Sequence, residues 1–124
     1  MNASSLTRVA ILSIALPLAQ MRLSAAGEPL ALRVTPTAAV GHATIRLRVL
    51  VEHDAMNRLL ELTADSGDFY QASSIQLDGE EAPKINEVVF RDMPQGTYEI
   101  VVRLLDPEGR VRAMARGTVV IIAP

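Results

Sequence analysis

The most constraining feature of this sequence is residues 43–52, where apolar and polar side chains alternate. One set of alternate positions is aliphatic: Ile45, Leu47, Val49 and Val51. The other set includes Thr44, Arg46, Arg48 and Glu52. A period of two places successive side chains on opposite faces of an extended chain. The run therefore predicts a β-strand with one buried face and one solvent-facing face.

The same pattern recurs along the chain and predicts six further strands. The clearest are residues 97–105, with Tyr98, Ile100, Val102 and Leu104 inward, and residues 110–122, with Val111, Ala113, Ala115, Val119 and Ile121 inward. Weaker runs are residues 30–35, 58–64, 70–77 and 84–91. Segments rich in Gly, Pro, Asp and Asn separate the runs, as turns require. Seven strands with regular turns predict an all-β, seven-stranded antiparallel sandwich with an aliphatic core and Phe90 and Tyr98 as aromatic anchors.

The N-terminal segment has the order of a secretory signal peptide. Residues 1–26 contain no Asp or Glu, Arg8 precedes an apolar run at residues 9–19, and Ser24, Ala25 and Ala26 precede Gly27. We expect cleavage before Gly27, which would leave residues 27–124 as one domain in the periplasm or outside the cell. The alternative is that residues 9–19 stay as a membrane anchor. The run of 11 apolar residues is short for that role, because a span needs about 20.

One corner of the predicted sandwich resembles a known family. The stretch Met93-Pro94-Gln95-Gly96-Thr97-Tyr98 is similar to the turn that precedes the sixth strand of immunoglobulin-like and fibronectin type III-like domains. The resemblance implies a tyrosine corner, in which the Tyr98 hydroxyl bonds back to the backbone of the turn. The match covers about ten residues closely, and the Cys pair and core Trp of true immunoglobulin domains are missing.

Composition narrows the function. The chain has no Cys, so it has no disulfide, thiolate ligand or Cys nucleophile. It also lacks a nucleophile-elbow motif and a Gly-rich phosphate loop, and we expect no enzyme activity and no cofactor. His42 and His53 lie at opposite ends of one predicted strand and cannot share a metal. After cleavage the chain would hold 10 basic and 14 acidic residues. Nucleic acid is therefore not an expected partner, and a membrane is expected only if the N-terminal segment is retained.

Seven carboxylates fall in three turns that a sandwich would place at one end. They are Glu52, Asp54, Asp78, Glu80, Glu81, Asp106 and Glu108, and together we call them the acidic pole. Turn propensity and solubility explain acidic turns without any ligand. The alternatives are a basic partner surface and a weak calcium site, although no Asp-x-Asp-x-Asp loop is present.

Two further surfaces are candidates for contact with another protein. Alternation places Leu59, Val101, Leu105 and Met114 on the outer face of neighbouring strands, where they could form one apolar patch. The polar run 70–77 suits an edge strand, which could pair with a strand of a partner. We therefore expect an exported, non-catalytic module that makes protein–protein contacts, with itself or another protein. The alternatives are a calcium- or small-ligand-binding domain that uses the acidic pole, and an accessory subunit or chaperone that pairs through an edge strand.

Overall fold

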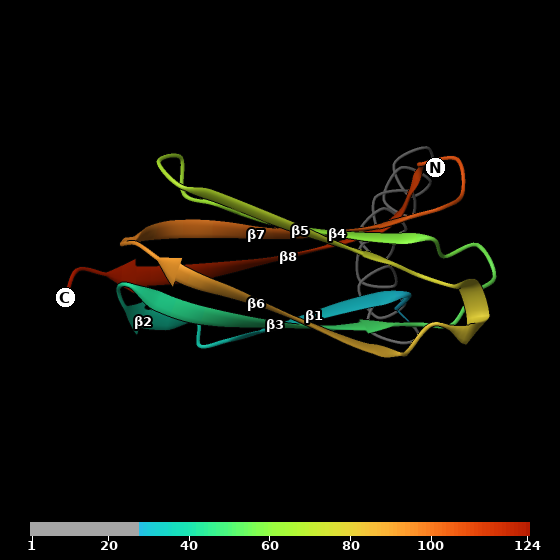
Figure 1. Cartoon of the computed structure of the whole chain (residues 1–124), viewed down its shortest axis with the longest axis horizontal. Coiled ribbons are helices and arrows are strands. Elements are labelled where there is room, and N and C mark those ends of the chain that lie inside the picture. Colours follow the sequence, from blue (N-terminus) through green and yellow to red (C-terminus); the bar gives the residue numbers. More distant parts are fainter. Residues whose placement is uncertain (1–27) are drawn as a thin grey trace, which may run out of the picture.

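The computed structural model describes residues 28–124, so the predicted signal peptide lies outside the described residues. Eight strands form two sheets (Figure 1). The three-stranded sheet has the order β1-β3-β6, and the five-stranded sheet has the order β2-β8-β7-β4-β5. The strands are β1 (Leu30–Thr35), β2 (Ala38–Val40), β3 (Ala43–Val51), β4 (Leu59–Asp65), β5 (Tyr70–Gln76), β6 (Ile85–Met93), β7 (Gly96–Leu105) and β8 (Val111–Ile122). The prediction of an all-β chain is confirmed.

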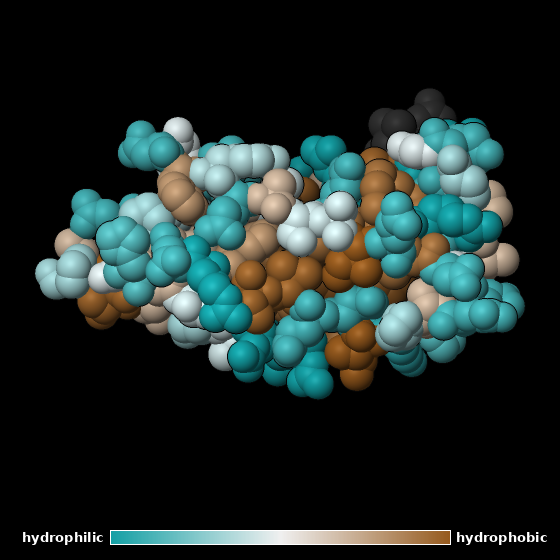
Figure 2. Space-filling view, in the orientation of Figure 1, coloured by the Kyte–Doolittle hydropathy of each residue, from teal (hydrophilic) through white to brown (hydrophobic). Residues whose placement is uncertain are grey.

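The two sheets enclose one hydrophobic core. β3 shows the alternation most clearly, since Ile45, Leu47 and Val49 are fully buried and the residues between them are exposed. The opposite sheet contributes a matching set of buried side chains: Leu60, Leu62, Tyr98, Ile100, Val102, Leu104 and Val119. In the side view of Figure 2, apolar side chains form a band along the middle of the molecule, with polar side chains above and below it. Burial of aliphatic surface is thus the main source of stability.

The prediction of seven strands is wrong by one. Residues 36–41 were expected to be a break, but β2 lies within them and pairs in parallel with β8. The Val120 N–H donates to the Thr37 carbonyl over 3.0 Å, and the Gly41 N–H donates to Ile122 over 2.8 Å. Pro36 ends β1 on one sheet, and the chain then crosses to the other sheet. A strand of three residues is too short to show a period in sequence.

The inward set expected for residues 110–122 is corrected at its start. The register between β7 and β8 shifts by one residue at Leu104 and Leu105, which leaves Arg112 as the extra residue of a β-bulge. Val111 was expected inward, but the bulge turns it to the other face, where it is 50% exposed. Gly117 keeps the regular register opposite Ile100. Alternation predicts faces only as far as the next bulge.

The edges of the sheets are β1 and β6 in one sheet and β2 and β5 in the other. The edge position expected for residues 70–77 is therefore confirmed, because β5 pairs only with β4. A short 3-10 helix, Gly79–Glu81, connects β5 to β6 across the side of the molecule. The Gln71 side chain also joins the two edges, since its amide donates to the Arg91 carbonyl over 2.8 Å. Within residues 28–124, no helix is long and apolar enough to cross a membrane.

Candidate functional site

The three turns that carry the acidic pole lie together at one end of the molecule, on the right in Figure 1. The Gly79 N–H donates to the Asn57 carbonyl over 3.2 Å, and the Arg58 N–H donates to Leu105 over 3.0 Å, so all three turns are joined by backbone hydrogen bonds. The carboxylates do not converge, however. Among residues 28–124, no three His, Asp or Glu side chains lie close enough to hold a metal ion. The calcium alternative therefore receives no support from the geometry of the acidic pole.

Two of the seven carboxylates instead stabilise their own turns. Asp106 accepts hydrogen bonds from the Glu108 and Arg110 N–H groups over 2.9 and 2.8 Å, and Arg110 pairs with it over 3.1 Å. These contacts favour the ionised form and lower the pKa of Asp106, with the Arg110 backbone as the largest cause. Asp54 accepts from the Met56 N–H over 2.8 Å. The preference of Asp for turns therefore explains both residues without any ligand.

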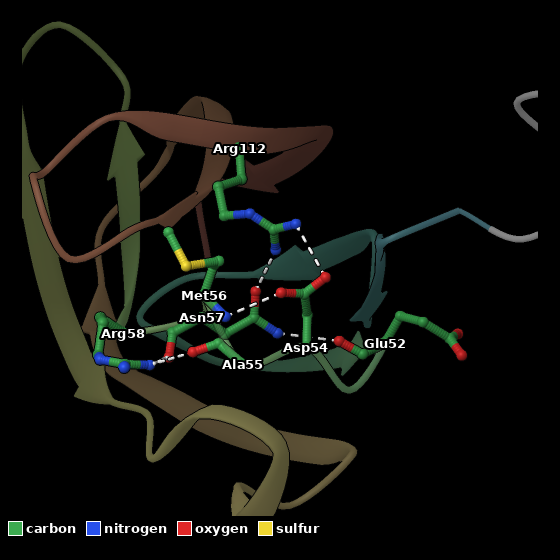
Figure 3. A network of polar contacts seen from close by, with 7 residues as sticks. All are labelled: Glu52, Asp54, Ala55, Met56, Asn57, Arg58 and Arg112. Atoms are coloured by element: carbon green, nitrogen blue, oxygen red, sulfur yellow. Dashed lines mark hydrogen bonds and ion pairs between the residues drawn. The ribbon is translucent and has the colours of Figure 1, made fainter.

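A polar network ties the β3–β4 turn to β8, and its centre is the buried Asn57 (Figure 3). The Asn57 amide nitrogen donates to the Glu52 carbonyl over 2.9 Å, and its oxygen accepts a hydrogen bond from Arg112. Arg112 also forms an ion pair with Asp54 over 3.1 Å. The bulge in β8 places Arg112 here, because Arg112 has no partner residue on β7 in the register of the two strands. Nothing in the sequence indicated this network, since an Asn in a turn carries no signal of burial.

Arg58 and Gly79 hold the β3–β4 turn at the acidic pole through close contacts with its backbone. The Arg58 guanidinium donates to the carbonyls of Ala55 and Asn57 over 2.6 and 2.8 Å. Gly79 has a φ of +56°, and a Cβ there would lie 3.2 Å from the Ala55 oxygen. Only glycine combines that backbone angle with so close an approach. The acidic pole is therefore a hydrogen-bonded scaffold. Glu108 pairs with Arg110 over 3.1 Å, and the other four carboxylates are exposed: Glu52, Asp78, Glu80 and Glu81.

The expected apolar patch on the five-stranded sheet is less continuous than alternation suggests. Met114 is 43% exposed, whereas Leu105 is only 8% exposed and offers little surface. Leu59 and Val101 are half-buried. Val101 lies in a shallow depression of about 530 Å³, whose rim includes Tyr70, Glu61, Arg103 and Glu99. The structure thus separates the four residues into one exposed, two partly covered and one buried.

Charges on this face are paired with each other. Arg103 lies 4.0 Å from Glu61, and Arg116 lies 3.0 Å from Glu99. Each arginine has an acidic neighbour on the adjacent strand, so the face is close to electrically balanced. A balanced face gives a charged partner little to recognise.

The outer face of the three-stranded sheet is different, and we call it the arginine face. Arg33, Arg46, Arg48 and Arg91 extend from it, and the acidic Glu87 lies directly opposite Arg48. Arg46 lies 3.8 Å from Glu87. Arg33 and Arg48 are direct cross-strand neighbours, a like-charge pairing that costs stability. A row formed by Ala31, Leu50 and Ile85 borders them, and Leu50 and Ile85 are 38% and 50% exposed.

The arginine face also holds arginines that form no ion pair within residues 28–124, although Glu87 lies directly opposite Arg48 on β6. In the described part of the chain, Arg33, Arg48 and Arg91 make no side-chain hydrogen bond or ion pair. Every other arginine between residues 28 and 124 makes a side-chain hydrogen bond, an ion pair or both. These arginines are Arg46, Arg58, Arg103, Arg110, Arg112 and Arg116. Sequence alternation placed Arg46 and Arg48 outward, but only the strand order puts Arg33 and Arg91 beside them.

Tyr98 is fully buried, and its hydroxyl donates to the Pro94 carbonyl over 2.7 Å. This is the hydrogen bond that the corner motif implied. The Phe69 ring packs edge-on against the Tyr98 ring, with 6.3 Å between the ring centres. Burial raises the pKa of Tyr98, which keeps the phenol neutral. Tyr98 is therefore part of the fold and not of a surface site.

Comparisons with known proteins support the fold and no more. No protein-family model matches the sequence, and no match is found among curated proteins. The structure is similar to superoxide reductase (neelaredoxin) from Ignicoccus hospitalis, with a TM-score of 0.55, 13% identity, and coverage of 76% of this chain and 80% of that chain. A variant of the same enzyme is similar with a TM-score of 0.56 and 14% identity. The match covers 82% of this chain and 86% of that chain.

A third similar structure is a CARDB domain from Pyrococcus furiosus, solved in complex with di-metal ions. Its TM-score is 0.50 and its identity 15%, with coverage of 77% of this chain and 94% of that chain. At such identities the likeness concerns the arrangement of strands, and it transfers no ligand or reaction to this chain.

The expectation that this chain is not an enzyme is overturned by the first of these comparisons. Superoxide reductase, an enzyme, has most of its chain in the same arrangement of strands. Size and fold therefore give no ground for excluding catalysis, because function depends on the side chains that a fold carries.

Proposed function

We propose that this protein is an exported module that makes protein–protein contacts in the cell envelope or outside the cell. The observation that carries the proposal is the arginine face, where Arg33 and Arg48 lie side by side and, like Arg91, make no ion pair within residues 28–124. A domain gains nothing in its own fold from two arginines in direct cross-strand register. Such a pair is explained if an acidic surface of a partner neutralises it on binding.

The neighbouring apolar row supports a protein as the partner. Leu50 and Ile85 are exposed beside the arginines, so the face offers apolar area together with positive charge. Interfaces between proteins combine these features, and arginine is enriched in them because its planar group pairs with carboxylates through two hydrogen bonds. The export part of the proposal rests on residues 1–26, which have the charge and apolar order of a signal peptide.

For the fold, we infer an immunoglobulin-like sandwich. The strand order β1-β3-β6 facing β2-β8-β7-β4-β5 supports this assignment, since it pairs the first, second and fifth major strands on one sheet. The bond from Tyr98 to Pro94 supports it as well. In such domains, one sheet face commonly remains open to solvent or to a partner.

The test compares two matched double variants of the full chain. Arg33→Gln with Arg48→Gln removes two charges from the arginine face, and Arg103→Gln with Arg116→Gln removes two from the other sheet. Complexes would be isolated from the native envelope or culture medium by chemical cross-linking, and the partner identified by mass spectrometry. Binding of the purified partner would then be measured over a range of salt concentrations.

We expect the first variant to lose the complex and the second to keep it. Wild-type affinity should fall as salt rises, because the contact is between opposite charges. Equal binding by both variants would contradict the proposed surface. Binding of wild type to anionic lipid vesicles or nucleic acid in place of a protein would contradict the proposed class of partner.

A further inference from the structure

β5 differs from the other edge strands because nothing in its sequence prevents pairing with another strand. Natural proteins protect edges by short length, charged side chains, proline, bulges or coverage by another element. β2 has three residues, β6 carries Glu87 and Arg91, and β1 lies against β8. β5 has seven residues without charge, proline or glycine, and its register with β4 has no bulge.

The free edge of β5 consists of the backbone groups of four residues. The Leu77 N–H donates to Arg58 on the β4 side, and the Ser66 N–H donates to the Phe69 carbonyl. Odd-numbered residues therefore direct their N–H and C=O groups toward β4, and even-numbered residues direct theirs outward, because these directions alternate along a strand. The outward set is Tyr70, Ala72, Ser74 and Gln76.

We propose that β5 pairs antiparallel with β5 of a second copy of this chain, about a two-fold axis at Ser73. In this register, Tyr70 lies opposite Gln76 of the second copy, and Ala72 lies opposite Ser74. All four outward residues of each copy then gain hydrogen-bonded partners, and registers shifted by two residues leave some of them unpaired. The two five-stranded sheets become one continuous sheet.

The side chains of β5 favour a second copy as the occupant. An uncharged strand meets itself without like-charge repulsion. Tyr70 is 60% exposed, and in this register its ring lies over Ser74 and Gln76 of the second copy, where the small serine leaves room. The contact repeats at both ends of the strand pair, as a two-fold interface requires. This inference is independent of the partner proposed for the arginine face, because β5 lies at the edge of the other sheet.

The first test is sedimentation of the full chain over a concentration series. Wild type should sediment as a dimer. Ser74→Pro should sediment as a monomer, because it removes an N–H that points to the free edge and leaves the bonds to β4 intact. Ala72→Lys should also be monomeric, since it adds two charges to the strand pair, one on each side of the axis. The circular dichroism spectrum checks that each variant is folded. A wild type that is monomeric throughout, or folded variants that remain dimeric, would overturn the proposal.

The second test fixes the register and does not depend on the proline variant. The chain has no Cys, so Ser73→Cys introduces a single thiol. Residues facing each other at a non-hydrogen-bonded position have Cα atoms about 4.5 Å apart, within the range of a disulfide. Oxidation should link Ser73→Cys into a dimer, whereas the control Thr118→Cys, exposed on β8, should stay monomeric. Equal cross-linking of both, or none of Ser73→Cys, would refute the proposed pairing.

Discussion

Replacement of Asn57 by Ala should destabilise the domain far more than its position in a turn suggests. Asn57 is 1% exposed, and its side chain makes two hydrogen bonds, one to the Glu52 carbonyl and one from Arg112 (Figure 3). A neutral hydrogen bond contributes about 1 kcal/mol net and a bond to a charged group about 1.5–3 kcal/mol. Together they give an expected loss of about 3 kcal/mol. That is a large part of the roughly 5–15 kcal/mol that a typical domain has.

The assay is urea and thermal unfolding, followed by circular dichroism. For a domain of this size, a loss of about 3 kcal/mol lowers Tm by roughly 10–20 °C. Asn86→Ala is the matched control, because Asn86 is 8% exposed and makes one bond, to the Pro83 carbonyl over 3.1 Å. We expect that variant to lose only about 1 kcal/mol.

A double-mutant cycle with Arg112→Ala then isolates the bond between the two side chains. The coupling free energy should be at least about 1 kcal/mol, since residues in one network are not additive. If Asn57→Ala unfolds like Asn86→Ala, or if its effect adds to that of Arg112→Ala without coupling, the account of the network is wrong.

Four further predictions follow from single contacts. Tyr98→Phe should cost about 1–2 kcal/mol at neutral pH. Because burial raises the pKa of Tyr98, wild-type stability should also decline above about pH 10, where the unfolded phenol ionises first, and a pH series of urea unfolding should show less of this decline in the variant. Asp106→Asn should flatten the fall in stability on acidification below about pH 4, since the native pKa of Asp106 is lowered and its ionised form stabilises the turn; unchanged acid sensitivity would contradict this. Gly79→Ala should cost about 1 kcal/mol or more through its positive φ, measured by Tm, and an unchanged Tm would show that the turn relaxes freely. Arg33→Glu should stabilise the domain by roughly 0.5–1 kcal/mol in urea unfolding, because it converts the repulsion with Arg48 into attraction; a loss would count against the like-charge pairing.

The seven longer strands could be predicted because each is encoded in its own residues. In β3, every second side chain from Ile45 to Val51 is buried, as the period of two requires. The edge position of β5 followed from its weak, polar pattern, and the hydroxyl bond of Tyr98 was implied by the resemblance of residues 93–98 to the corner of immunoglobulin-like domains. Each of these depends on neighbours within a few positions, where local rules hold.

The errors arose where distant segments meet. β2 is defined by its bonds to β8 and not by its three residues, and Val111 turned outward because of a bulge set by the register with β7. Leu105 was expected to be exposed but is buried beside the turns. Local sequence patterns do not determine the pairing register between strands that are tens of residues apart.

The sequence by itself therefore determined the class of fold, the main strands and the pattern of an export signal at residues 1–26, which remains a prediction. Tertiary structure alone decided which charges are paired. It placed Arg112 against Asn57, gave Arg103 and Arg116 acidic neighbours, and left Arg33 beside Arg48. The physical reason is that secondary structure depends on the period of side chains along the chain, whereas hydrogen bonds and ion pairs depend on the strand order and register that bring remote residues together.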